Sequence, residues 1–448
     1  METLRVALGD IAEVTKLAGF EFTKHIEYLT DGEIIAIRGL NVKKGILDLT
    51  NIKRISNKAS DLLPRSKLFK DDLVLTYTGT IGEVALITED DRFHLAPNVA
   101  VVRPSGVNPY YLYCYMRSRV FKRDFETFSV GSTQKTVPMK NIRQVEIPLL
   151  PEKTQIEIGR IISLFDDKIE LNQKMNQTLE DIAKAIFKSW FVDFDPVRAK
   201  VEGRPTGLPP EISDLFPDEL VDSEIGEIPK GWGVAKLAEI CETTDYVANG
   251  SFSTLKENVT KVDSFSGTEA VMLRFADFNK GWAGDFSFVT HDSYDFLSKS
   301  KVFCGDIVIC NVGEVGAVFR APNLGYDMTL GPNGVLCKNF ESGIGLGREY
   351  FYFCMTEKTF TSRVEAISSG SVQTKFNKTD FRNLDVLVPH SELLAIVDPM
   401  FGQICQRLDV ILDENRILSQ LRDTLLLKLI SGELRIPDAE KFLEEAGI

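Results

Sequence analysis

Two patterns of hydrophobic and polar residues alternate along the chain, and each occurs twice. Residues 1–150 and 231–388 contain short runs of β-branched and apolar residues, such as Leu73–Tyr77, separated by Gly, Asn and Pro. This pattern predicts short strands joined by tight turns. Residues 151–191 and 389–436 instead carry apolar residues at alternating spacings of four and three, which predicts two long helices.

Both predicted helices follow a heptad repeat, which favours a coiled-coil pair over two ordinary surface helices. An asparagine occupies an a-type position in each helix, and two interpretations stay open. Each asparagine is either a polar interruption in contact with solvent or half of a buried polar pair that fixes the helix register. The heptad positions are Ile161, Phe165, Lys168, Asn172, Met175, Leu179, Ile182 and Ile186, and then Phe401, Ile404, Leu408, Ile411, Asn415, Leu418, Arg422, Leu425 and Leu429.

The chain is an internal duplication of one unit of roughly 240 residues. Four segments of the first half recur in the second half in the same order, with an offset that drifts only from 234 to 239 residues. Chance does not account for four ordered matches. The matched segments are Ile37–Gly45 with Leu273–Gly281, Asp72–Gly82 with Asp306–Gly316, Pro97-Asn98 with Pro332-Asn333, and Gly131–Gln134 with Gly370–Gln373.

These patterns predict an α+β protein in which two pseudo-two-fold-related domains, each mixed α/β with a twisted sheet, are separated by two long helices. The stretch between the first helix and the second domain is rich in Pro, Gly and acidic residues, and we interpret it as an ordered linker anchored by Leu215, Phe216 and Ile225. The predicted boundaries are 1–150 for the first domain, 151–191 for the first helix, 192–230 for the linker, 231–388 for the second domain, and 389–448 for the second helix and C-terminal tail.

Composition limits the class of protein. With 448 residues, 44% hydrophobic and 26% charged, the chain has the composition of a soluble globular protein of two or three domains. No run approaches the roughly 20 apolar residues of a membrane helix, and the N-terminus lacks an export signal, so we expect a cytoplasmic location. The 7 cysteines form no Cys-x-x-Cys pair, which argues against a disulfide framework or a zinc site.

The charge and the missing motifs narrow the chemistry. The net charge is −13, but residues 1–150 carry 21 Lys and Arg against 18 Asp and Glu, so a locally basic surface remains possible. No Gly-Lys dipeptide of a P-loop and no His-Glu-x-x-His motif occurs in the sequence. We therefore predict a chain without a catalytic centre, a bound metal or a cofactor.

Three stretches carry a family resemblance. The segment Ser189–Val197, the Leu215-Phe216-Pro217 triplet with Asp222–Trp232, and the C-terminal Leu427–Leu434 are very similar to conserved regions of the specificity subunits of type I restriction–modification enzymes. The resemblance implies a non-catalytic, DNA-reading subunit of a defence system against foreign DNA. It implies assembly with two modification (methyltransferase) subunits and two restriction (translocase and nuclease) subunits. It further implies two target-recognition domains, each reading half of a split asymmetric target, and antiparallel helices as the spacer.

The duplicated glycine loops supply candidate DNA contacts, because backbone comes closest to phosphate at glycine. Lysine can form ion pairs with phosphate, glutamine can form two hydrogen bonds with adenine, and arginine can form two with guanine. If two domains read different targets, however, a residue that they share more often stabilises the structure or binds phosphate than it selects a base. The candidates are Arg38, Lys43, Lys44, Arg54, Thr78, Gly79, Gly131, Ser132, Gln134, Lys135, Arg274, Lys280, Lys299, Lys301, Gly313, Gly370, Ser371, Gln373 and Lys375, with Asn172 and Asn415 as candidates for the helix register.

Two alternative functions remain open at this point. The chain could be the recognition subunit of a fused type II restriction enzyme, with the same role beside a different catalytic partner. It could also be a bilobed scaffold that binds only proteins, which would need no basic face. Salt-dependent DNA binding separates the scaffold from the other two.

Overall fold

The chain folds into two compact units, each of which contains one β-rich domain and one end of both long helices. The first unit is Met1–Glu170 with Leu418–Ile448, and the second is Leu171–Ile417. The computed structural model describes residues 4–43, 45–131, 134–282, 284, 286–340, 343–370 and 374–446.

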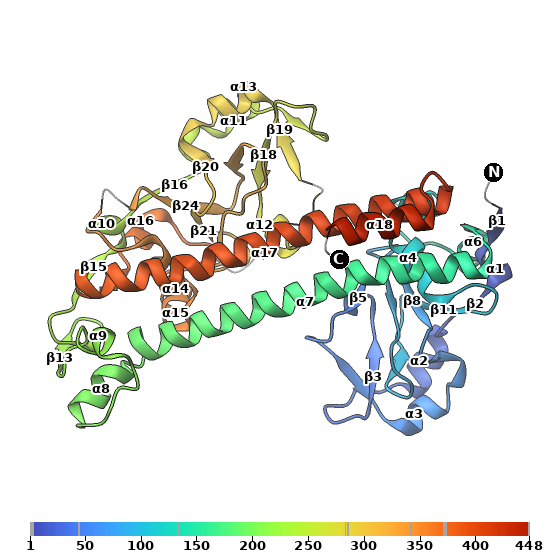
Figure 1. Ribbon diagram of the computed structural model, residues 1–448, viewed down its shortest axis with the longest axis horizontal. Coiled ribbons are helices and arrows are strands. Elements are labelled where there is room, and N and C mark those ends of the chain that lie inside the picture. The colour runs from blue at the N-terminus through green and yellow to red at the C-terminus, as the bar shows by residue number, and fades with distance from the viewer. Residues whose placement is uncertain are drawn as a thin grey trace. The chain divides into compact units, whose positions relative to one another are not determined.

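Two four-stranded sheets form the domain of the first unit (Figure 1). The first sheet is antiparallel throughout, with the order β2 (Ala12–Lys16), β11 (Val99–Pro104), β8 (Leu73–Thr76), β9 (Val84–Leu86). The second sheet is mixed, because its two central strands run parallel, and its order is β6 (Lys53–Ile55), β3 (Ile34–Ile37), β10 (Phe93–Leu95), β7 (Lys67–Leu68). Two further pairs are β1 (Arg5–Ala7) with β12 (Glu146–Pro148) and β4 (Val42–Lys43) with β5 (Ile46–Leu47).

Short helices complete this domain, and the aromatic-rich helix α4 supplies much of its core. Asn108 caps α4 by accepting a hydrogen bond from the Tyr111 amide at 3.0 Å, and Pro109 occupies the first turn. The Tyr111 side chain is fully buried in the main hydrophobic cluster. The helices are α1 (Leu8–Ile11), α2 (Gly19–His25), α3 (Asn57–Asp61), α4 (Pro109–Arg117), α5 (Arg119–Thr127) and α6 (Met139–Gln144), with 3₁₀ turns η1 (Gly39–Asn41) and η2 (Pro64–Ser66).

The second unit repeats this architecture. Its antiparallel sheet has the order β16 (Glu242–Asp245), β24 (Gly334–Lys338), β21 (Ile307–Cys310), β22 (Val318–Arg320). Its mixed sheet has the order β17 (Lys261–Val262), β19 (Ser287–Val289), β18 (Ala270–Leu273), β23 (Met328–Leu330), β20 (Lys301–Val302), with β18 and β23 parallel like β3 and β10. The domain is completed by β15 (Gly233–Lys236) with β25 (Asp385–Val388), α10 (Leu237–Ile240), α11 (Phe252–Asn258), α12 (Phe275–Asn279), α13 (His291–Phe296), α14 (Arg348–Thr356), α15 (Lys358–Ala366), α16 (Lys378–Arg382), η3 (Tyr246–Asn249) and η4 (Ser298–Ser300).

The two long helices are α7 (Glu152–Phe191) and α17 (Ser391–Ser431), and they run antiparallel. In the second unit the Asn172 amide donates to the Asn415 amide oxygen at 3.0 Å, and Asn176 reaches the Leu408 carbonyl at 3.5 Å. From the first of these contacts to the second, the residue number rises along α7 and falls along α17, so the two helices run in opposite directions. The predicted α+β fold with two domains and two long antiparallel helices is confirmed. Asn172 is only 3% exposed, and its role in fixing the register stays a prediction.

The buried face of α7 departs from the strict heptad in the second unit. Met175 and Ile182, both predicted to lie in the seam, are 37% and 48% exposed, whereas Ala183 and Phe187 are buried. A straight helix turns every 3.6 residues, so its buried face drifts away from a 3.5-residue repeat. The aromatic cluster around Phe187, whose ring lies 5.2 Å from that of Tyr350, sets which face of α7 is covered here.

The linker is ordered, as the sequence predicts, and it packs on the second unit. It contains α8 (Asp195–Val201), α9 (Pro210–Ser213) and the hairpin β13 (Leu220–Ser223) with β14 (Gly226–Pro229). Phe216 packs edge-on against Trp190, with the ring centroids 5.5 Å apart. The C-terminal helix α18 (Ile436–Ala446) packs in the first unit, where Ala439 and Leu443 are buried.

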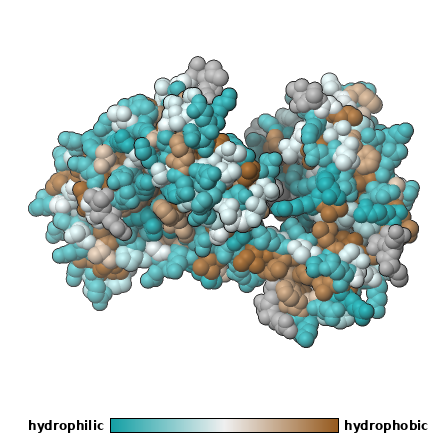
Figure 2. All heavy atoms as spheres, turned by 90° about the horizontal axis from the view of Figure 1, so that it is seen from above, coloured by the Kyte–Doolittle hydropathy of each residue, from teal (hydrophilic) through white to brown (hydrophobic). Residues whose placement is uncertain are grey.

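No helix in the described part of the chain is long and apolar enough to cross a bilayer. On the face seen in Figure 2, hydrophilic side chains predominate and apolar ones form small separate groups.

Phe216→Ala should lower the free energy of unfolding by about 3 kcal/mol, because it empties a buried aromatic site. Phe216 is 2% exposed, whereas Phe303 in the same unit is 63% exposed. Phe303→Ala is therefore the matched control, and it should cost far less in the same urea titration. Equal losses for the two variants would contradict the anchoring role of the linker.

Candidate nucleic-acid interface

The four duplicated segments, which are distant in sequence, meet at one end of the strands in the first unit. The parallel strands β3 and β10 end side by side there, and the glycine turn after β8 lies against the hairpin that begins at Val130. We call this end the loop edge, and it comprises residues 38–41, 78–82, 97–98, 130–131 and 134–136. The backbone bonds that join its parts are Ala96 N–H to Ile37 O at 2.9 Å, Tyr77 N–H to Asn98 O at 3.4 Å, Val137 N–H to Tyr77 O at 2.8 Å, and Gly79 N–H to Lys135 O at 2.9 Å.

The second unit builds its own loop edge from residues 274–277, 312–316, 332–333, 369–370 and 374–375. Each backbone bond of the first copy has a counterpart between matching residues. These are Gly331 N–H to Leu273 O at 2.8 Å, Asn311 N–H to Asn333 O at 3.1 Å, Phe376 N–H to Asn311 O at 3.2 Å, and Gly313 N–H to Thr374 O at 3.1 Å. The same backbone frame is therefore made twice from different side chains.

Left-handed residues shape this frame. Gly79 and Gly313 have φ angles of 81° and 95°, which residues with a side chain rarely adopt. Asn98 and Asn333 have φ angles of 72° and 73°, and asparagine is among the few other residues that tolerate them. Both asparagine side chains are exposed at the loop edge. The repeated Pro-Asn pair was visible in the sequence, but its position beside the glycine turn was not.

The two shared arginines hold the loop edge together. Arg274 makes two hydrogen bonds to the fully buried carboxylate of Asp277, at 2.6 and 3.0 Å, and the hydrogen bond raises the pKa of Arg274 above its ordinary value. Arg38 instead donates to the Asn51 carbonyl at 2.6 Å and to the side chain of Asn41. Both guanidinium groups therefore have structural contacts, and a role in reading guanine stays a prediction.

Several predicted lysines lie at or beside the two loop edges. Lys135 pairs with Glu126, and Lys280 and Lys375 are exposed. Lys43 forms a 3.0 Å ion pair with Asp48, whose pKa is lowered to about 2, mainly by hydrogen bonds from Thr50.

The remaining polar candidates of the first loop edge surround the glycine turn. Thr136 donates a hydroxyl hydrogen bond to Thr78 at 3.3 Å, and a Cβ at Gly79 would lie 4.0 Å from the exposed Gln134 amide. Gly131 and Gly370 sit in the two hairpins with φ angles of 93° and 119°.

Some candidates lie elsewhere. Arg54 donates to the Gly32 carbonyl at 3.2 Å near the start of β3, which is the opposite end of that strand. Lys301 pairs with Asp295 at 3.1 Å and lies over the Tyr294 ring, and Lys299 is in the neighbouring turn η4. The structure does not bring these three residues to a loop edge. Lys44, Ser132, Ser371 and Gln373 lie outside the described residues.

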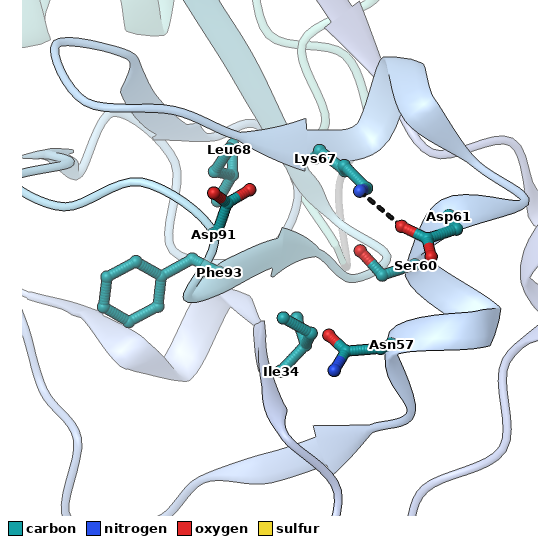
Figure 3. A pocket seen from close by; sticks show the side chains of 8 residues that line it. All are labelled: Ile34, Asn57, Ser60, Asp61, Lys67, Leu68, Asp91 and Phe93. Atoms are coloured by element: carbon teal, nitrogen blue, oxygen red, sulfur yellow. Dashed lines mark hydrogen bonds and ion pairs between the residues drawn. The ribbon is translucent and has the colours of Figure 1, made fainter.

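A small cavity of about 160 Å³ lies at this opposite end in the first unit (Figure 3). Its wall combines β3, β7 and β10 with α3, and a 2.5 Å ion pair between Lys67 and Asp61 borders it. In the second unit the matching pair is Lys301 with Asp295, and Tyr294 stands where the first unit has Ser60. Tyr294 is buried against the sheet there and fills the corresponding space. The cavity of the first unit therefore exists because Ser60 is smaller than tyrosine.

In the described part of the chain, no group of three or more His, Cys, Asp or Glu side chains could hold a metal ion. What the structure offers instead is two copies of one polar loop surface. The described residues thus form a duplicated α+β fold with one polar loop surface in each unit.

Comparisons with known proteins identify the family. Residues 3–181 match the family model described as the type I restriction modification DNA specificity domain. The chain is 24% identical to the HindI specificity subunit of Haemophilus influenzae, covering 96% of this chain and 98% of that protein. It is 25% identical to the MjaIX specificity subunit of Methanocaldococcus jannaschii, covering 92% and 88%.

The fold agrees with these matches. The crystal structure of a type I restriction–modification S subunit from M. genitalium superposes with a TM-score of 0.50 at 15% identity, covering 96% of both chains. Residues 3–181 thus carry a type I restriction modification DNA specificity domain, and almost the whole chain is similar to specificity subunits of type I restriction enzymes. The prediction of a specificity subunit, rather than a catalytic subunit, is thereby confirmed.

Arg274→Ala should lower the free energy of unfolding by about 2 kcal/mol, because it leaves the buried Asp277 carboxylate without its cation. The double variant with Asp277→Asn should recover most of this loss, since asparagine is the residue at the matching position, Asn41, of the first unit. Thermal and urea unfolding give both values. An Arg274→Ala variant of unchanged stability that loses DNA affinity would assign Arg274 to a DNA contact instead.

Proposed function

We propose that the chain reads a bipartite, asymmetric DNA target, with one half-site at each loop edge, and directs methylation or cleavage by partner subunits. The observation that supports this proposal is the exact repetition of the backbone frame with altered side chains. Thr80 of the first loop edge corresponds to the exposed Glu314 of the second, and Lys135 corresponds to Thr374. Equal frames suit equivalent positions on a duplex, and different side chains suit different bases.

Phosphate contact supplies the affinity in this proposal. Backbone comes closest to a ligand at glycine, where no side chain intervenes. A Cβ at Gly313 would meet no atom within 4 Å, so its surroundings are open. The exposed Lys135 and Lys375 add positive charge to the two edges. Screening over about 10 Å lets these local charges act despite the net charge of −13.

The partner proposal rests on apolar residues that the two long helices leave uncovered in the second unit. On α7, Leu171, Met175 and Ile182 are exposed at spacings of four and seven. On α17, Ile396, Val410 and Ile417 are exposed at multiples of seven. Each set forms one stripe along its helix.

The stripe on α17 faces away from the mixed sheet of the second domain. Val410 lies across α17 from Leu412, which packs against the cluster of the mixed sheet. We propose that apolar helices of the modification subunit cover the stripes, since helix-on-helix contact is the simplest way to bury them. In the whole assembly we propose two modification and two restriction subunits, acting on DNA in the cytoplasm.

The first test of this function is salt-dependent binding of the chain, assembled with its modification subunit, to DNA that contains the target. Gln134→Ala combined with Lys135→Ala should weaken binding to the first half-site and reduce the slope of log affinity against log salt by about one. Lys67→Ala, at the opposite end of the same domain, is the matched control and should leave the slope unchanged. A salt-independent affinity of the unaltered complex would favour a protein-binding scaffold.

The helices should also set the distance between half-sites. One heptad added to both α7 and α17 preserves the helix contacts and lengthens each helix by about 10 Å. Methylation mapping should then show a spacer longer by about one to three base pairs, at about 3.4 Å per pair, with both half-sites unchanged. A folded, active variant with the original spacer would show that the helices do not measure distance.

A further inference from the structure

The position after the first glycine of each turn differs in charge between the two loop edges. Thr80 follows Gly79, and Glu314 follows Gly313. The turns themselves match, because Gly82 N–H bonds Thr76 O at 2.9 Å and Gly316 N–H bonds Cys310 O at 3.0 Å. Both side chains are exposed. One shared backbone position thus presents a neutral hydroxyl in one domain and a carboxylate in the other.

A carboxylate at this position is unexpected on a surface that would contact phosphate. Like charges repel, and the repulsion grows as the interface excludes water. Glu314 is nevertheless held in place, because one carboxylate oxygen accepts a hydrogen bond from the Asn279 amide at 2.9 Å. Asn279 closes α12, directly before the exposed Lys280. The carboxylate is therefore oriented within the loop edge rather than trailing into solvent.

A base edge offers the partner that a phosphate cannot. In the major groove, the exocyclic amino group of cytosine presents a donor, and glutamate or aspartate is the side chain that accepts from it. A carboxylate that meets this donor is compensated, whereas guanine and thymine present no hydrogen-bond donor there. Adenine presents an amino donor as well, but its N7 acceptor lies beside that donor and repels the second carboxylate oxygen. The position thus favours a single base.

We propose that Glu314 is a specificity-determining residue of the second domain and accepts a hydrogen bond from the amino group of a cytosine in the second half-site. This inference rests on the proposed function. Thr80 lacks the charge, so the corresponding base of the first half-site need not be cytosine. The two half-sites then differ at a position that the shared frame places identically.

The test is methylation mapping with the assembled modification complex on a library randomised across both half-sites. Glu314→Gln keeps an oxygen that can accept from Asn279, but it adds a donor, and this pair of groups matches adenine. Preference for cytosine at one position of the second half-site should fall about tenfold or more, with adenine gaining. The first half-site should not change. Glu257→Gln, an exposed carboxylate on α11 of the same unit, is the matched control and should leave both half-sites intact.

Three results would overturn the inference. The first is an unchanged motif with a folded, active Glu314→Gln complex. The second is an affinity that rises equally for all sequences, which would make Glu314 only a charge near the backbone. The third concerns Glu314→Thr, which is tested if Glu314→Gln does not fold and which carries the residue of the first domain. This variant should weaken the preference for cytosine at the same position of the second half-site, and an unchanged motif would refute the proposal. If the unaltered complex shows no sequence preference at all, the proposed function itself fails.

Discussion

One backbone contact, made once in each unit, holds the loop edge together. The amide of a left-handed glycine donates to a hairpin carbonyl, from Gly79 to Lys135 and from Gly313 to Thr374. This bond joins two segments separated by more than 50 residues and fixes the turn whose tip carries Thr80 or Glu314. Any residue with a Cβ strains this turn, because its φ angle lies in the left-handed region. The frame therefore depends on glycine, while the tip is free to vary.

The duplication acts as an internal control on the role of each residue. Features present in both copies, such as the arginine that braces Asn41 or Asp277, belong to the frame. Features that differ, such as Ser60 against Tyr294 or Thr80 against Glu314, mark positions where the copies diverged. Divergence at the buried end of the sheet changes the packing, whereas divergence at an exposed tip changes the charge and the hydrogen-bonding groups that the domain presents to solvent. Position within the frame thus separates the two kinds of change.

Much of the architecture follows from local pattern, and the rest depends on contacts between distant segments. The 3.6-residue period and the repeats predict the helices and the duplication, because both are properties of short windows. The meeting of Arg38, Gly79 and Asn98 depends on the parallel pairing of β3 with β10, which no window contains. The sequence likewise predicts a phosphate contact for both Lys280 and Lys301. Lys301 instead lies with Tyr294 at the other end of the sheet. The exposed Met175 shows that tertiary packing also decides which helix face is covered.

We propose that each domain reads its own half-site independently of the other. Methylation mapping of a chimera tests it most directly, with residues 231–388 replaced by the matching domain of a relative that has a different target. The account predicts that one half of the methylated sequence changes to that of the relative, while the other half and the spacer stay the same. A folded, active chimera in which both halves change would contradict it.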